Sequence, residues 1–279
     1  MSKLKPALLL LPALVLLGVF FYGFVRLFGV SVGLGPTGRG FDLAGYVDFA
    51  MSETNRLILV RTLRVSAITT LAAIVVAYPI AYAIARVSSP GLKYTLLVLS
   101  LSPWLISLVI STYGWSVLLS PRGTINSVLL DLGIIDAPLG ILYNSFSVIV
   151  GMVHVFVPFL IMSIYSSLAR LDWRLLEAAS VLGSGPVGRF VKVTLPMTAR
   201  GVVSGATIVF LLATGAVVTP VLLGGLKDRM LATLIYQDVI GNSNTERAAV
   251  ATFCLILFTL PVVALLGWIE RRVGPKAGR

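Results

Sequence analysis

The chain has 279 residues, of which 57% are hydrophobic and only 12% are charged, and its formal net charge is +11. Soluble domains carry about a quarter charged residues, so this composition excludes an ordinary soluble enzyme and predicts a membrane protein. In such a protein, excess Lys and Arg is more typical of cytoplasmic loops than of nucleic-acid binding, and one cysteine and one histidine exclude disulfide frameworks and Cys/His metal sites by count.

Six apolar stretches approach or exceed the length that crosses a bilayer, which is about 20 residues. They cover Ala7–Phe28, Leu57–Ala85, Tyr94–Leu119, Asn144–Leu168, Gly201–Leu223 and Ala248–Ile269. None shows the alternation of a transmembrane barrel. We therefore predict an all-α polytopic membrane protein with six transmembrane helices. The first stretch is longer than the apolar part of a signal peptide and lacks an A-x-A-like cleavage site, so we expect it to remain as a span.

The segment Gly29–Arg56 separates the first two stretches and contains "GLGPTGRG". Arg39 and Gly40 stand where a phosphate-binding loop requires Lys and Ser or Thr, so we predict a flexible connection. No other segment resembles a nucleotide site, and we expect this chain to hydrolyse no ATP by itself. The predicted organisation is a first helix with its connection (1–55), a five-helix core (56–272) and a basic tail (273–279).

The distribution of charge predicts the orientation in the membrane. With the N-terminus placed in the cytoplasm, the inner segments hold a large excess of cations, and their acids are Asp172, Glu177 and Glu270. The outer segments are nearly balanced. This asymmetry follows the positive-inside rule and predicts that both termini are cytoplasmic.

A polar island at 171–200 separates the fourth and fifth stretches. Asp172 is a typical N-cap, and Gly183 is typical of the position just beyond a helix end. Between them, residues at three- and four-residue spacing form one apolar face: Leu171, Leu175, Leu176, Ala179 and Leu182. We predict a short helix that does not cross the membrane.

A second short helix is expected to open at Pro186 and to end at Pro196. Its apolar face consists of Val187, Phe190 and Val191, and its basic face of Arg189 and Lys192. One interpretation is an amphipathic element that rests on membrane lipid. The small residues of the first helix favour close approach by a protein partner instead.

The sequence "EAASVLG" (Glu177–Gly183), followed after eleven residues by Leu195-Pro196, resembles the EAA loop of permease subunits of binding-protein-dependent ABC importers. The resemblance implies that this loop docks on a cytoplasmic ABC ATPase dimer, which binds ATP and Mg, while this chain binds no cofactor. Glu177 would pair with a basic group of the ATPase, Ala178 and Ala179 would allow close packing, and Gly183 would make the sharp turn. An extracytoplasmic solute-binding protein is also implied.

The resemblance extends over roughly 56–268, where "RTLRVSAITTLAAIVVAYPIAYAIAR" and "TPVLLGGLKDRMLATLIYQDVI" are similar to the spermidine/putrescine branch. Within that branch the chain resembles the first of two different permease subunits. This implies a heterodimer, with a homodimer as the alternative. Members of the branch often carry an arginine where this chain has Ser111, and a glutamate or aromatic residue near Ala216-Val217. Amino-acid derivatives, phosphonates, opines and metal chelates therefore stay open beside polyamines.

Four polar residues are candidates for the translocation pathway: Ser111, His154, Thr214 and Thr219. His154 lies within the fourth span, four residues before Pro158, and either forms an interhelical hydrogen bond or lines the path. The two threonines, with Pro220, either shape a cavity or serve helix packing.

Other polar and small residues in the spans have simpler interpretations. Arg64 is expected to snorkel to the headgroups, and Gly201 with Gly205 to permit close helix contact. Tyr113 and Trp115 are expected in the interfacial aromatic belt, with contact to a docked binding protein as the alternative.

These observations predict the permease subunit of an ATP-driven importer in the cell inner membrane, a translocase subunit and not an enzyme. Its solute would be polyamine-like or a related amine. The alternative is a self-contained carrier driven by an ion gradient, which usually places coupled ionisable residues deep in its bundle. Here His154 is the only such group near the centre of a span. A membrane anchor without transport would leave the EAA spacing unexplained.

Overall fold

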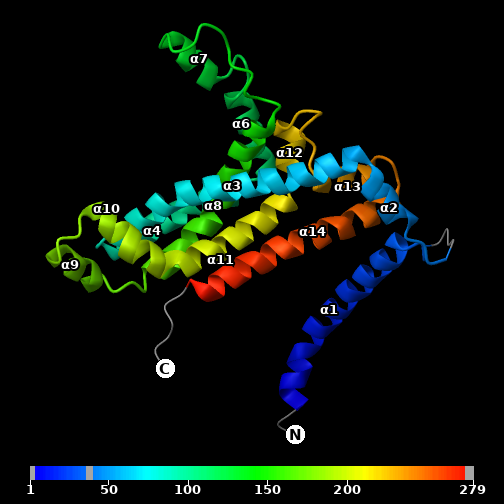
Figure 1. The fold of residues 1–279 in the computed structure, drawn as a ribbon, viewed down its shortest axis with the longest axis horizontal. Coiled ribbons are helices and arrows are strands. Elements are labelled where there is room, and N and C mark those ends of the chain that lie inside the picture. Colours follow the sequence, from blue (N-terminus) through cyan, green and yellow to red (C-terminus); the bar gives the residue numbers. More distant parts are fainter. Residues whose placement is uncertain (1–3, 36–39, 274–279) are drawn as a thin grey trace. The chain divides into compact units, whose positions relative to one another are not determined.

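The structure, a computed structural model, describes residues 4–35 and 40–273. These residues form helices and connections without a strand (Figure 1), which confirms the all-α fold class. The helices are α1 (Leu4–Ser31), α2 (Ala44–Met51), α3 (Glu53–Arg86), α4 (Pro90–Ser100), α5 (Ser102–Leu105), α6 (Leu108–Leu118), α7 (Thr124–Asp131), α8 (Ser145–Leu168), α9 (Arg174–Val181), α10 (Pro186–Arg189), a π-helical turn (Phe190–Thr194), α11 (Leu195–Thr214), α12 (Val218–Leu223), α13 (Leu231–Ile240) and α14 (Thr245–Arg272).

Five helical stretches in the described ranges are long and apolar enough to cross a membrane. They are Pro12–Ser31, Glu53–Arg86, Ser145–Leu168, Pro186–Thr214 and Thr245–Arg272. Each overlaps one of the predicted spans. The predicted flexible connection is partly helical, because it contains α2 and because α3 already begins at Glu53. The cation-bearing "GLGPTGRG" motif falls partly on 36–39, outside the described residues.

The prediction of one continuous helix over Tyr94–Leu119 is wrong, because the chain forms α4, α5 and α6 there instead. The breaks have local causes. Pro103 lacks a backbone N–H and would clash with the preceding turn if the helix continued, so α4 ends at Ser100, whose Oγ donates to the Leu97 carbonyl at 2.7 Å. Ile106 and Ser107 then adopt extended ψ angles of 142° and 127°, and α6 starts afresh.

The predicted fifth span, Gly201–Leu223, also has different bounds. The helix is continuous from Pro186, and α11 ends at Thr214, after which α12 is a separate helix. Pro220 explains the separation, since in an uninterrupted helix its ring would clash with the carbonyl of Ala216. Pro220 thus belongs to the short helix α12.

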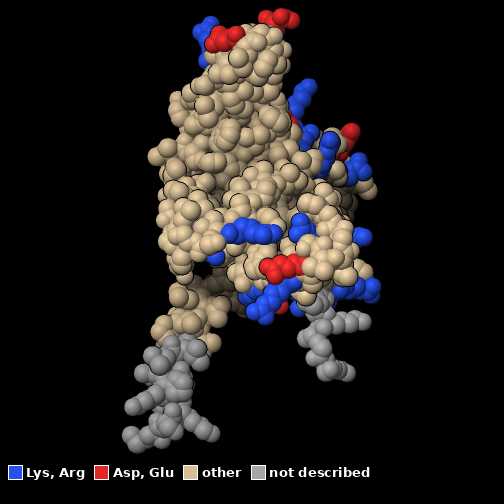
Figure 2. Space-filling model, turned by 90° about the vertical axis from the view of Figure 1, so that its left-hand side faces the viewer, with Lys and Arg blue, Asp and Glu red and all other residues tan. Residues whose placement is uncertain are grey.

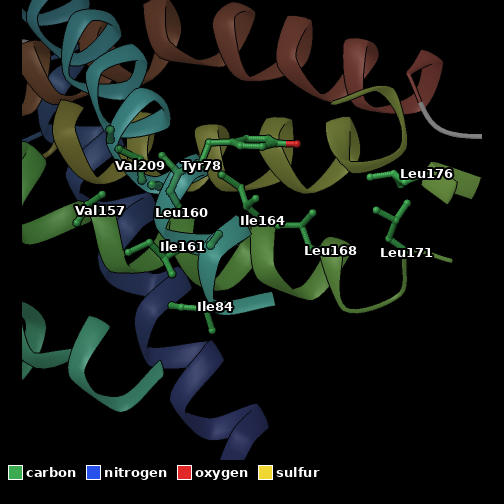
Figure 3. Close-up of a cluster of buried hydrophobic side chains, with 13 residues drawn as sticks. Tyr78, Ile84, Val157, Leu160, Ile161, Ile164, Leu168, Leu171, Leu176 and Val209 are labelled. Atoms are coloured by element: carbon green, nitrogen blue, oxygen red, sulfur yellow. The ribbon is translucent and has the colours of Figure 1, made fainter. Parts of the chain in front are cut away.

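The chain divides into two compact units. The larger unit comprises 58–233 and 258–279, and its main core joins α3, α8 and α11 with the segment before α9 (Figure 3). Its buried members are Ala73, Ala77, Tyr78, Ala81, Ile84, Val157, Leu160, Ile161, Ile164, Leu168, Leu171, Leu176 and Val209. The smaller unit comprises 1–57 and 234–257, where Phe253 contacts Phe24 and Phe28 edge to face at 5.3 and 5.2 Å.

The close approach of α8 and α11 depends on glycines. Ser163 Oγ donates to the Gly201 carbonyl at 2.8 Å, and a methyl group on Gly201 would lie 2.3 Å from Ser167 Oγ. Gly205 is similarly closed in by Ser163 and Leu160. The predicted contact role of the Gly201–Gly205 pair is confirmed. The predicted division into an N-terminal part, a core and a tail stays a prediction, and most of the tail falls on 274–279, outside the described residues.

Candidate coupling site and pathway

The first arm of the polar island is the short helix α9. Its N-cap position is occupied by Trp173, one residue after the predicted Asp172, whereas the predicted turn at Gly183 is confirmed. Asp172 Oδ1 accepts a hydrogen bond from the Arg174 backbone N–H at 3.0 Å. At the other end Gly183 has φ +79°, and two backbone bonds close the helix: Gly183 N–H to the Ser180 carbonyl and Ser184 N–H to the Ala179 carbonyl, both at 3.0 Å. This pair of bonds is a Schellman motif, which needs a left-handed residue just beyond the helix.

The predicted apolar face of α9 is divided between the core and the surface. Leu171 and Leu176 are each 6% exposed and join the row of buried side chains that runs along α8 (Figure 3). By contrast, Leu182 is 86% exposed and its neighbour Val181 is 87% exposed. The helix is therefore anchored on one side and presents apolar side chains on another.

The prediction that Pro196 ends the second short helix is wrong. The chain runs without interruption from α10 through the π-helical turn into α11. The Leu195 N–H bonds to the carbonyl of Phe190, five residues back, and this widened turn accommodates Pro196, which has no N–H to donate and needs room for its ring. Of the predicted apolar face, only Phe190 packs on the core, and Val187 is 76% exposed.

We define the coupling surface as five exposed residues in or near the EAA sequence: Glu177, Ala178, Val181, Leu182 and Val187. Ala179 is half-buried, and Leu195 and Pro196 lie in the first turn of α11. Figure 2 looks at the end of the molecule that carries α9 and α10, where Lys and Arg side chains surround a few acidic ones. An exposed apolar tip within a charged rim is typical of a protein-docking surface.

The candidate pathway residues lie on α6, α8, α11 and α12 and do not form one cluster. Two pairs bring three of these helices together: the Trp115 and His154 rings meet edge to face at 5.6 Å, and Thr112 Oγ1 lies 3.5 Å from Thr219 Oγ1. Thr214 instead donates to the carbonyl of Phe210 in its own helix at 2.7 Å.

Sequence reasoning missed Thr112 and placed Trp115 in the interfacial belt, whereas Trp115 is half-buried against His154. Thr112 is only 1% exposed. The available signal was a threonine within a largely apolar predicted span. The contact with α12 depends on the fold and has no signature in the sequence.

Thr219 is held in place by close packing of α12 on α8. A methyl group on Gly151 would lie 2.8 Å from Thr219 Cγ2 and 2.5 Å from Leu223 Cδ1. Ser147 Oγ also donates to the Leu223 carbonyl at 2.8 Å in a buried bond. Over residues 4–35 and 40–273, no group of three His, Cys, Asp or Glu side chains is placed to hold a metal ion.

The sequence profile of the family described as "Binding-protein-dependent transport system inner membrane component" matches residues 6–275. The spermidine/putrescine transport system permease protein PotB of Escherichia coli is 32% identical over 216 residues, which cover 77% of this chain and 78% of that protein. PotB of Haemophilus influenzae is 36% identical over 183 residues, covering 66% and 64%.

A likeness in fold extends over nearly the whole chain. A chain of the bacterial alginate ABC transporter, solved in complex with an alginate pentasaccharide-bound periplasmic protein, matches with a TM-score of 0.79. The sequence identity is 20%, and the match covers 98% of this chain and 96% of that one. At this identity the likeness supports the arrangement of helices alone.

Proposed function

Because the chain belongs to the family of binding-protein-dependent transport system inner membrane components, it is the permease subunit of an ABC importer, and we propose that it moves a small amine solute into the cell. As a translocase subunit it is not an enzyme, and ATP is hydrolysed by a separate subunit of the transporter. The proposed solute is a polyamine or a related amino-acid derivative. Similarity to spermidine/putrescine permeases supports this solute class.

The observation that carries the proposal is the coupling surface on α9. Its apolar side chains, Val181 and Leu182, are almost fully exposed although the chain buries apolar residues of the same helix nearby. We propose that this surface inserts into a cleft of a cytoplasmic ABC ATPase dimer, where Glu177 pairs with a basic side chain. Exposed Ala178 permits close approach, and the turn at Gly183 fixes the direction in which the chain leaves α9.

A second permease subunit is proposed to cover the apolar helices α4 and α5. None of the residues in these two helices is buried, although most of them are apolar. Helices in a bilayer associate through such uncharged surfaces by close packing. The partner is proposed to be a different permease chain, with a second copy of this chain as the alternative, and an extracytoplasmic binding protein delivers the solute to the pair.

The proposed translocation pathway passes the contacts between α6, α8 and α12. His154 and Thr219 lie at these contacts, and Ser111 precedes one of them. Thr214 is proposed to contribute only through helix packing, because its hydroxyl is already bonded within α11. We further propose that the residues of 171–200 and both termini face the cytoplasm, as the excess of basic residues there supports.

A reversed charge at Glu177 and a new charge at Leu182 test the docking proposal. In Glu177→Lys and Leu182→Asp, the amount of ATPase that co-purifies with the permease in mild detergent is expected to fall about tenfold, because the desolvated contacts of an interface centre contribute about 1–3 kcal/mol each. Leu226→Asp is the matched control, since Leu226 is 85% exposed and lies outside the loop.

Membrane insertion is checked for all three variants by their yield in the membrane fraction. The control should retain the ATPase at the level of the unmodified chain. Full ATPase retention in both Glu177→Lys and Leu182→Asp would contradict docking through this surface.

A further inference from the structure

One side of the last turns of α3 carries Tyr78, Tyr82 and Arg86, at successive spacings of four residues, and the coupling surface does not use them. Spacing of four places them on one face of the helix. Tyr78 Oη lies 2.8 Å from Thr198 Oγ1 in a buried hydrogen bond to α11. Arg86 donates through Nη2 to Tyr82 Oη at 2.7 Å.

This face contacts both arms of the loop. Trp173, the residue before α9, meets Tyr82 edge to face at 6.0 Å. Phe190, the first residue of the π-helical turn, meets Tyr78 at 5.2 Å and Tyr82 at 6.5 Å, again edge to face. The ends of the loop are therefore joined to each other through α3.

The Arg86 guanidinium packs against the rings of Tyr82 and Trp173. Its central carbon lies 4.6 Å from the Trp173 ring centroid and 5.3 Å from that of Tyr82, within the range of a cation–π interaction. Among the residues that the structure describes, Arg247 and Asp238 form an ion pair, whereas Arg86 has no acidic partner. The cation thus acts as a bridge between α3 and the start of α9.

We propose that Arg86, Tyr82 and Trp173 form a positioning stack that makes the end of α3 follow α9 when the ATPase moves it. The stack carries no solute and does not touch the ATPase. It converts displacement of the loop into displacement of α3, whose last turns also carry Ala77, Ala81 and Ile84 of the main core. This inference rests on the proposed docking of α9 and adds a route by which docking is transmitted.

Uncoupling is the expected sign of a broken stack. In proteoliposomes that contain the complete transporter, with its binding protein purified together with its natural solute, Arg86→Ala and Trp173→Ala should retain the ATPase and its basal ATP hydrolysis. Stimulation of hydrolysis by the loaded binding protein should fall about three- to tenfold, as expected for loss of one cation–π contact. Arg86→Lys and Trp173→Phe should restore most of it, since each preserves a cation or a ring.

A double-mutant comparison separates the stack from general damage. The Arg86→Ala/Trp173→Ala pair should be no worse than either single variant, because both remove the same contact. Arg170→Ala is the matched control, an exposed cation three residues before Trp173, and should behave like the unmodified chain.

Two results would overturn the proposal. Normal stimulation in both alanine variants would show that α3 is not driven through the stack. Equal loss of ATPase attachment in both would show that the stack only holds α9 in place for docking. Failure of the proposed function looks different, since then the unmodified transporter itself would show neither attachment nor stimulation.

Discussion

Gly183 sets the shape of the coupling loop through its backbone alone. Its φ of +79° lies in the left-handed region, which costs residues with a Cβ about 1–2 kcal/mol. A methyl group placed on it would meet no atom within 4 Å, so contact with neighbouring atoms does not explain why glycine is needed at this position. The requirement for glycine here is conformational.

We therefore expect Gly183→Val to lower ATPase co-purification by about tenfold, because a β-branched residue opposes the left-handed turn that directs the chain out of α9. Gly183→Asn is the informative companion, since asparagine tolerates this conformation. It should keep most of the attachment. Equal loss in both variants would indicate that the ATPase contacts this position directly, in contrast to the conformational explanation.

Among the contacts between elements, α8 and α11 approach each other closely at Gly201. The Gly201 carbonyl accepts the bond from Ser163, and the space that a Cβ would occupy is taken by Ser167 and the Ser163 backbone. Backbone atoms cannot move aside as a flexible side chain can. The pairing therefore depends on the absence of a side chain.

Gly201→Ala is expected to destabilise the protein by about 1–3 kcal/mol through overpacking, measured as a lower midpoint of thermal unfolding in mild detergent. Gly267→Ala in α14 is the control, because nothing lies within 4 Å of its added methyl group. That change should be neutral or slightly stabilising, since alanine favours helices over glycine by about 1 kcal/mol. An unchanged midpoint in Gly201→Ala would show that the two helices can separate without cost.

The elements that the sequence predicted well are those with local causes. The end of α9 follows from Gly183, and the predicted start of the fourth span at Asn144 coincides with a capping box of Asn144 and Ser147. The prolines at 103 and 220 were visible in the sequence as possible helix breaks. The prediction from hydropathy nevertheless treated the apolar stretches on both sides of each proline as one span.

Pro196 shows the limit of such reasoning. A proline ends many helices, but here one π-helical turn, whose first residue Phe190 packs on Tyr78 of α3, accommodates it. Contacts between distant segments, such as Trp115 with His154 or Arg86 with Trp173, have no signature in a single sequence. The EAA motif of the candidate site could therefore be recognised in the sequence, whereas the residues that contact and support the site could be identified only from the fold.

At the scale of the whole molecule, orientation in the membrane decides whether the coupling surface can meet an ATPase. The chain has a single cysteine, Cys254, which is buried. A Cys254→Ser background thus permits labelling at chosen exposed positions. Ser180 in α9 and Ser127 in α7 are both exposed and fall on opposite sides in the proposed topology.

We expect Ser127→Cys to react with a membrane-impermeant maleimide in intact cells, and Ser180→Cys to react only after the membrane is opened. The physical reason is the asymmetry of basic residues, which retains the positive loops in the cytoplasm. The reverse pattern would place the coupling surface outside the cell and contradict ATPase docking. Equal labelling of both positions before the membrane is opened would mean leaky cells, so a cytoplasmic cysteine protein serves as the control.

The central claim is that this chain works as the permease of an ATP-driven importer, coupled to its ATPase through α9. Affinity purification from native membranes in mild detergent, with the bound proteins identified by mass spectrometry, tests it most directly. We expect an ABC ATPase, a second permease and a soluble binding protein to be recovered with the chain. Recovery of the chain alone, together with solute movement in liposomes without ATP, would contradict the account and favour an ion-coupled carrier.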